Sequence, residues 1–441
     1  MRHLGFCGVC LTLVVGAALA ANEPPASLPP VADSAGGLDR GAFDPRFSDP
    51  NAPFGRERAF PHRIELPPGI PFGGGLPANV VPPPAGVRLP GEFENQEMIL
   101  LAYNDLVSIY PDLFLELAKT LRGKTRVAVL VDAGQSQFID ELLAEHDLVG
   151  LQIDRIEVPH DTMWVRDYGP IVVKGKAGRR TAVDADYLQF GRPLDDAVPS
   201  LMAGPRKLDV VAMNIDLEGG NLLSNGDGLL LSTTTVLEVN RAQGRDDGDV
   251  VEFFRQFFGG QVEFLEPLDS EATGHVDMFA TFTAPDTVLV GAYDPEDDPI
   301  NAEVLDRNAA RLARLTLSDG RKLRVVRIPM PKNDDGVWRT YTNVVMANGV
   351  VLVPSYPDID PAVDRNALAT FRSLMPAWQV KPIDVSEVIG TGGALHCMTR
   401  NIPAEDDAPA AGATPSEPRS RRIVERLSRR RPRLLPPTPA G

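Results

Sequence analysis

Five side chains of this sequence have types suited to catalysis. Cys397 supplies a thiol, His275 an imidazole, and Asp167, Glu218 and Asp277 supply carboxylates. A thiol becomes a nucleophile when a partner such as His275 handles its proton. Buried carboxylates need a cation to offset their charge, and a planar, forked guanidinium is one that carboxylates bind in a bidentate manner. The set indicates thiol chemistry on a guanidino carbon.

The five residues occur in four short polar segments. These are MWVRDYGP at 163–170, LEGGN at 217–221, GHVDMF at 274–279 and GGALHCMT at 392–399. The first is strand-like up to its Gly-Pro break, and the paired glycines of the second allow close backbone approach. His275 and Asp277 are two residues apart, so on a strand both would point to one face. His396 adjoins Cys397 and on a strand would face away, so no catalytic role is expected for it.

Structural explanations compete with the catalytic one for each residue alone. Asp167 could pair with a neighbouring arginine, Glu218 could cap a turn, and Cys397 could be a small buried hydrophobe. His275 and Asp277 could instead ligate a metal, with Glu218 or His160 nearby. The residue types by themselves give the guanidine interpretation a modest lead.

Short apolar runs and helical patterns alternate through residues 91–404. Strands are expected at 98–102, 126–131, 153–158, 171–173, 210–213, 229–231, 276–282, 287–290, 323–328, 344–347 and 350–353. Helical periodicity occurs near 108–122, 135–148, 247–258, 302–315 and 363–374. Several strands for each of five helices indicate a mixed α/β fold rather than a regular doubly wound sheet.

The two ends differ from this body. Residues 1–20 have a basic start, an apolar run and an Ala-Leu-Ala cleavage site, which predicts a signal peptide and export to the periplasm or medium. Residues 21–87 form a Pro/Gly-rich arm, residues 88–404 a single catalytic domain, and residues 405–441 a Pro/Arg-rich tail expected to be disordered. Signal removal would leave Cys397 as the only one of three cysteines.

Charge bears on the expected partners. The 441 residues carry a net charge of −16, and residues 22–404 alone carry −20. An acidic body argues against nucleic acid and suits a cationic ligand. The apolar run is too short to remain as a membrane span, and the basic tail could make weak contact with an anionic surface. A non-catalytic secreted binding protein is the alternative of another class.

The four motifs, in this order, resemble those of the family of agmatine deiminases and bacterial-type peptidylarginine deiminases. Pro90–Glu94, Tyr341–Asn343 and Val351–Pro354 extend the resemblance over residues 88–404. The family belongs to the guanidine-modifying superfamily, so the resemblance implies an α/β fold, a five-bladed pseudo-symmetric propeller in a single domain. It implies no metal and no organic cofactor.

The resemblance also implies roles for the motif residues. Cys397 would attack the guanidino carbon, and His275 would protonate the departing ammonia and then activate water. Asp167 and Asp277 would hold the guanidinium, and Glu218 would orient His275 or the substrate. Further substrate-binding candidates are Trp164, Arg166, Asn343 and Arg192.

The substrate remains open among three guanidines. Residues 184–196 lack the Trp- and Gly-rich stretch of agmatine-specific members, which favours peptidyl or free arginine, giving citrulline. Arg192 could clamp the carboxylate of such a substrate, or could simply pair with Asp195 or Asp196. The alternative is agmatine, giving N-carbamoylputrescine.

Overall fold

A computed structural model describes residues 82–405 except 84, 207 and 334. The predicted signal at 1–20, the arm up to residue 81 and the tail from residue 406 lie outside the described residues. The last residues of the predicted arm already contact the domain, since Val87 is buried and Arg88 pairs with Lys174 in an antiparallel bridge. Among the described residues, no helix combines the length and apolarity needed to cross a bilayer.

One strand order is repeated in five sheets. In each, an antiparallel pair is followed by a helical connection to a third strand that lies parallel to the second. Four of these modules follow one another along the chain. The first contains β4 (Ile171–Lys174), β5 (Arg180–Asp186), α4 (Pro193–Arg206) and β6 (Asp209–Asp216), and the second contains β7 (Leu223–Ser224), β8 (Leu229–Thr233), α5 (Thr235–Ala242), α6 (Asp247–Phe258) and β9 (Gln261–Leu265). The third contains β10 (Ala280–Ala284), β11 (Thr287–Ala292), α7 (Pro299–Leu312) and β12 (Arg324–Pro329). The fourth contains β13 (Val345–Ala347), β14 (Val350–Ser355), α8 (Pro361–Leu374) and β15 (Gln379–Asp384).

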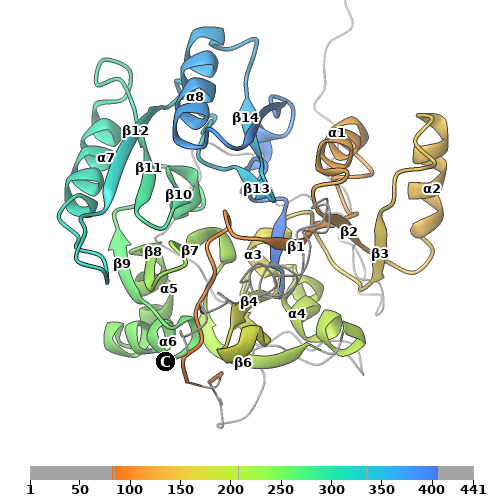
Figure 1. The fold of residues 1–441 in the computed structure, drawn as a ribbon, viewed down its shortest axis with the longest axis horizontal. Coiled ribbons are helices and arrows are strands. Elements are labelled where there is room, and N and C mark those ends of the chain that lie inside the picture. Colours follow the sequence, from red (N-terminus) through yellow and green to blue (C-terminus); the bar gives the residue numbers. More distant parts are fainter. Residues whose placement is uncertain (1–81, 84, 207, 334, 406–441) are drawn as a thin grey trace, which may run out of the picture. The chain divides into compact units, whose positions relative to one another are not determined.

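The remaining module joins both ends of the domain. Its strands and helices are β1 (Gln96–Ala102), α1 (Pro111–Leu121), β2 (Arg126–Val131), α2 (Ser136–Glu145) and β3 (Asp154–Glu157). The antiparallel partner of β1 is β16 (Arg400–Pro403), the last strand among the described residues. This pairing closes the series, and Figure 1 shows the five sheets one after another around the centre of the domain with helices on the outside. The mixed α/β fold expected from the sequence is confirmed.

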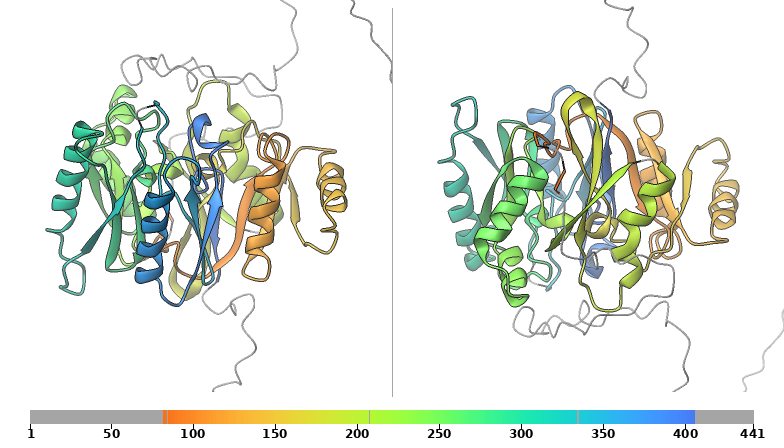
Figure 2. Two further views of the ribbon diagram at one scale, coloured as in Figure 1. Left: turned by 90° about the horizontal axis from the view of Figure 1, so that it is seen from above. Right: turned by 90° about the horizontal axis from the view of Figure 1, so that it is seen from below.

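Local signals explain where the helices begin and end. Asp298 and Asp360 accept hydrogen bonds from backbone N–H groups at the first turns of α7 and α8, and each precedes a proline at the first helical position. Gly259 ends α6 with a φ of 70°, a conformation that costs glycine little. Between helices and sheets lies an apolar core in which Phe114 of α1 and Phe371 of α8 belong to one cluster. Burying each such ring contributes about 1.5–3 kcal/mol. Figure 2 shows these helices covering the outer faces of the sheets.

The structure corrects several predicted elements. It contains eight α-helices in the described part rather than five. Helix α4 was missed because two prolines and a glycine interrupt its apolar period, and α5 because it is short. The expected strand at 276–282 begins instead with the 3-10 helix η5 (Val276–Met278), and the strand-like segment before Gly169 is the single helical turn α3 (Val165–Tyr168).

Candidate active site

The candidate catalytic residues occupy equivalent places in the repeated modules. Each lies within a few residues before the first strand of its module, ahead of β4, β7, β10, β13 and β16. The residues in these five segments are Asp167 on α3, Glu218 before the 3-10 helix η4 (Gly219–Asn221), His275 and Asp277 at η5, Asn343, and Cys397. Repetition of one topology therefore brings together residues up to 230 positions apart in the sequence.

A turn before β16 carries the nucleophile candidate, and Asn343 holds this turn. The Asn343 side-chain oxygen accepts hydrogen bonds from the backbone N–H groups of His396 (2.8 Å) and Cys397 (3.3 Å). Its Nδ2 donates to the Cys397 sulfur at 3.2 Å. Cys397 is 3% exposed. Asn343, predicted as a substrate-binding candidate, thus orients the thiol and supplies a donor to a thiolate.

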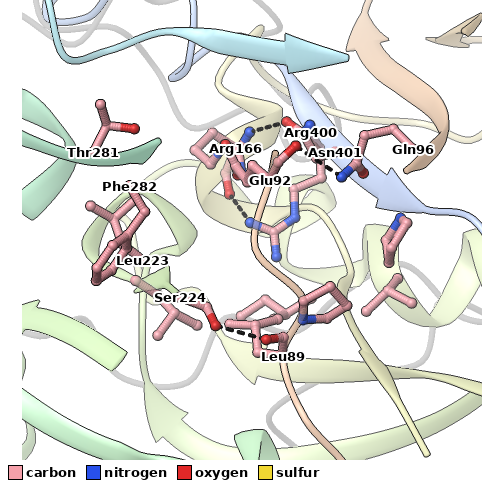
Figure 3. Close-up of a pocket in the computed structure, with 15 residues that line it drawn as sticks. Leu89, Glu92, Gln96, Arg166, Leu223, Ser224, Thr281, Phe282, Arg400 and Asn401 are labelled. Atoms are coloured by element: carbon pink, nitrogen blue, oxygen red, sulfur yellow. Dashed lines mark hydrogen bonds and ion pairs between the residues drawn. The ribbon is translucent and has the colours of Figure 1, made fainter. Parts of the chain in front are cut away.

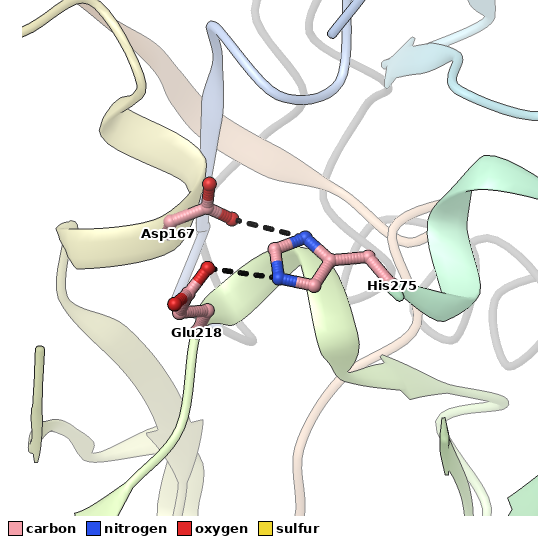
Figure 4. A group of neighbouring side chains, drawn as sticks. All are labelled: Asp167, Glu218 and His275. Carbon is pink, nitrogen blue, oxygen red and sulfur yellow. Dashed lines mark ion pairs between the residues drawn. The ribbon is translucent and has the colours of Figure 1, made fainter. Parts of the chain in front are cut away.

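The imidazole of His275 lies between two carboxylates, as Figure 4 shows. Its Nε2 is 2.9 Å from an oxygen of Glu218, and its Nδ1 is 3.7 Å from Oδ1 of Asp167. Asp167 also accepts a hydrogen bond from the Gly220 N–H at 2.9 Å. A negative charge on each side of the ring favours its doubly protonated, positively charged form.

Asp277 connects this group to the thiol. Its Oδ2 is 3.8 Å from the Cys397 sulfur, and its side chain is 1% exposed. Its Oδ1 and the Nδ1 of His275 are buried atoms without a hydrogen-bond partner among the described residues. A buried carboxylate oxygen without a donor is costly, and a guanidinium N–H placed there would satisfy it.

Two glycines leave space around these groups. A Cβ at Gly220 would lie 2.6 Å from Nδ1 of His275, 2.7 Å from Oδ1 of Asp167 and 3.1 Å from Oδ2 of Asp277. A Cβ at Gly393 would lie 2.9 Å from the sulfur and 2.7 Å from the ring of Trp164. Trp164 therefore lies beside the nucleophile, where its ring can contact the carbon chain of a substrate.

The charges of the site shift the pKa values of its members. Burial raises the pKa of Asp167 to about 7, with the carboxylates of Glu218 and Asp277 adding to the shift. Burial lowers the pKa of His275, but the carboxylates of Asp167 and Glu218 outweigh it and raise that pKa to about 10. Burial and the charges of Asp277 and Asp167 raise the pKa of the Cys397 thiol. The site therefore holds an imidazolium, a thiol and an excess of negative charge that suits a cation.

The backbone N–H of Arg166 donates to the Cys397 carbonyl oxygen at 3.1 Å, but its side chain bonds other partners. Its guanidinium donates to Glu92 at 2.5 Å, to the Asn401 side chain at 2.9 Å and to the His396 backbone oxygen at 3.2 Å. The side chain lines a separate pocket together with Glu92 and Arg400, shown in Figure 3. Arg166 was predicted to bind substrate, and in the structure its guanidinium donates to three internal partners.

Arg192 lies near the site, beyond Glu218. Its Nη1 donates to the Tyr187 hydroxyl at 2.9 Å. Burial lowers the pKa of Arg192, but Tyr187, Asp195 and Glu218 raise it more. Gln189, which the sequence did not indicate, donates to the Glu218 carboxylate. Glu218 is therefore bound on one side by Gln189 and on the other by His275.

His396 and Glu92 are the other residues that sequence reasoning missed. His396 was expected to face away from the site, but its Nδ1 is 2.7 Å from Oδ2 of Asp277 and its Nε2 is 3.0 Å from Glu92. The alternation argument failed because residues 395–398 form a turn rather than a strand. The only sequence signal was the position of His396 beside the thiol.

Three ligand types in the site could hold a metal ion. Atoms of Asp167, Glu218 and His275 lie within 4.8 Å of one another. However, the Glu218 oxygen lies at hydrogen-bond distance from Nε2 of His275, whereas Asp167 approaches the other ring nitrogen. The two carboxylates therefore do not lie around the same nitrogen, as ligands of one metal ion bound to that nitrogen would. His160 is not a member, because its nitrogens contact Val158 and Asn104. The geometry fits an imidazolium better than a metal ligand.

Known proteins resemble this chain over the whole domain. The family model of the Porphyromonas-type peptidyl-arginine deiminases matches residues 88–403. A Vibrio parahaemolyticus protein described as an agmatine deiminase is 25% identical over 368 residues, covering 74% of this chain and 99% of its own. The solved agmatine deiminase of Enterococcus faecalis is 25% identical with a TM-score of 0.64, covering 72% and 96%. A solved Porphyromonas gingivalis protein described as an arginine deiminase is 25% identical with a TM-score of 0.61, covering 72% and 98%.

Proposed function

Because the chain belongs to the Porphyromonas-type peptidyl-arginine deiminase family and is a hydrolase of amidine C–N bonds, we propose that its substrate is agmatine. The observation that carries the proposal is the juxtaposition of the Cys397 thiol with the buried, unpartnered Oδ1 of Asp277 and the imidazolium of His275. Relatives described as agmatine deiminases support agmatine over the arginine substrates that the sequence favoured.

The proposed reaction begins with charge neutralisation. The guanidinium binds between Asp167 and Asp277, whose charges otherwise raise the pKa of the Cys397 thiol. With those charges offset, the thiol releases its proton to solvent and the resulting thiolate attacks the guanidino carbon. His275 donates its proton to the departing nitrogen, so that the C–N bond breaks and ammonia leaves.

Hydrolysis completes the cycle. The S-alkylthiouronium remains bound to Cys397, and the now neutral His275 takes a proton from water. The resulting hydroxide attacks the same carbon, the C–S bond breaks as the hydroxyl proton passes to the departing sulfur, and N-carbamoylputrescine leaves with the Cys397 thiol restored. Glu218 keeps the imidazole in place throughout, since it accepts from Nε2 while Nδ1 faces Asp167.

Electrostatics near Arg192 also support agmatine. Four acids interact electrostatically with the Arg192 guanidinium, namely Asp105, Asp161, Asp195 and Glu218. A substrate carboxylate would compete with these acids for Arg192, whereas the ammonium of agmatine would be attracted by them. Arginine, free or at a peptide terminus, is the second candidate because Arg192 is a cation near Glu218.

Substrate comparison tests the proposal. We expect kcat/KM for agmatine to exceed that for arginine or a peptide with C-terminal arginine by about tenfold or more, a difference of ~1.4 kcal/mol in transition-state binding. Arg192→Gln should not lower arginine turnover more than agmatine turnover, and Arg372→Gln, an exposed arginine on α8, is the matched control. Preferential turnover of arginine, lost only in Arg192→Gln, would select the second candidate. No ammonia from any of the three would contradict the function itself.

Inhibition distinguishes thiol from metal chemistry. We expect EDTA to leave the rate of ammonia release unchanged, because the carboxylates of Glu218 and Asp167 pair with the imidazolium of His275 rather than with a metal in the proposed reaction. Iodoacetamide should abolish the rate, and agmatine should protect against it. A rate lost in EDTA and restored by Zn²⁺ would instead support a metal-dependent hydrolase.

A further inference from the structure

The side of Asp277 away from His275 contacts a second histidine. His396 is 2% exposed, and its Nδ1 lies 2.7 Å from Oδ2 of Asp277. On the opposite edge of the ring, Nε2 lies 3.0 Å and 3.1 Å from the two oxygens of Glu92. His396 thus links a carboxylate that faces the nucleophile to one that does not.

The guanidinium of Arg166 keeps the Glu92 carboxylate ionised. Arg166 donates to Glu92 at 2.5 Å and is itself 2% exposed. Figure 3 shows the Arg166 and Glu92 side chains. Burial raises the pKa of Glu92, but Arg166 and His396 outweigh this and hold it well below its usual value. A carboxylate that is ionised can only accept, so the proton in the Glu92–His396 contact belongs to the ring.

The same reasoning assigns the proton at the other ring nitrogen of His396, Nδ1, which faces Asp277. Burial and Arg166 lower the pKa of His396, but the Glu92 and Asp277 carboxylates outweigh them and the net shift is upward. These three are the charged groups that face the ring. An imidazole that donates at both nitrogens is an imidazolium, and the charges then alternate along Arg166, Glu92, His396 and Asp277.

We propose that His396 is a positioning residue, an imidazolium whose contact with Oδ2 holds the Asp277 carboxylate in the orientation that presents Oδ1 to the guanidinium. Asp277 has this role in a site that already contains the carboxylates of Asp167 and Glu218. Three neighbouring carboxylates repel one another, and a cation behind one of them offsets that repulsion. His396 does not contact substrate, and it acts only through Asp277. This inference rests on the proposed function for its substrate, but the ionisation of His396 does not.

Substrate binding without turnover tests the role. In a Cys397→Ser background, His396→Gln should raise the Kd for agmatine by about tenfold or more, a change of ~1.4 kcal/mol, because a neutral amide cannot balance Asp277. In active enzyme the same substitution should raise KM more than it lowers kcat. His146→Gln, an exposed histidine, is the matched control and should change neither. An unchanged Kd in the His396 variant would overturn the proposal.

Nitrogen-15 NMR of the histidine rings tests the ionisation directly. At pH 7.5 one ring with two protonated nitrogens should disappear from the spectrum in His396→Gln, and Glu92→Gln should lower the pH at which that ring titrates. A neutral ring at His396 would overturn the proposal even if the binding data agreed. If His396→Gln does not fold, Glu92→Gln gives both readouts. If wild type releases no ammonia and Cys397→Ser binds no agmatine, the proposed function fails while the spectrum still decides the state of His396.

Discussion

Replacing Cys397 by Ser is expected to abolish ammonia release from agmatine, with a fall in kcat on the order of 10⁴-fold or more. The physical reason is that a hydroxyl ionises far less readily than a thiol, and the carboxylates that raise the pKa of the Cys397 thiol would oppose a Ser alkoxide still more. Asn343 can donate to the Ser oxygen as it does to the sulfur at 3.2 Å. The turn should therefore keep its shape.

Retained binding is the internal control for this variant. Asp167, Asp277 and Trp164 are unchanged in it, so agmatine should still raise the Tm of the Ser protein. Mass spectrometry of wild type quenched during turnover should show a covalent adduct on Cys397, and the variant should show none. Ammonia release within tenfold of wild type would contradict the assignment of Cys397 as nucleophile.

Replacing Gly220 by Ala should lower kcat/KM by about 100-fold or more while the domain stays folded, because small displacements of reacting groups cost this much. The added methyl would lie 2.6 Å from Nδ1 of His275 and 2.7 Å from Oδ1 of Asp167, so one or both side chains must move. The Gly220 N–H also donates to Asp167, so movement of the backbone to relieve the contact would shift the same carboxylate.

Gly150→Ala is the matched control for that substitution. A Cβ at Gly150 meets nothing within 4 Å, and the residue is exposed. It should leave kcat/KM and Tm unchanged, whereas Gly220→Ala should change kcat/KM with a small change in Tm. If Gly220→Ala had wild-type activity, the space that Gly220 leaves beside Asp167 and Asp277 would not be the site of the guanidinium.

Much of the fold was predictable from local pattern. The strand at 126–131 and the helix at 247–258 have the bounds expected from their apolar residues, because each has a clear apolar pattern that ends at a turn signal. Helix α4 and strand β15 (Gln379–Asp384) were missed because prolines and polar residues interrupt their patterns. Such elements are stabilised by neighbouring strands and by helices packed on the sheet, and these neighbours lie outside any short stretch of the sequence.

The candidate site was predictable in its chemical groups but less so in its contacts. Cys397, His275 and Asp277 were identified by residue type and motif, and the structure brings them together with Asp167 and Glu218. His396 was expected to face away from the site but contacts Asp277, and the guanidinium of Arg166, a predicted substrate-binding residue, donates to internal partners. Both lie in helical or irregular turns, where the alternation of strand side chains does not hold.

The sequence by itself determined which functional groups are available, namely one thiol in the domain, its imidazole and its carboxylates, and the mixed α/β class of the chain that carries them. Only the tertiary structure decided which groups face one another. The repeated module places the segment before each first strand at the centre of the domain, so that Asp167 meets His275, and His396 lies between Asp277 and Glu92. Such contacts depend on the closure of β1 against β16 and on backbone turns, and neither is encoded in the spacing of residues along the chain.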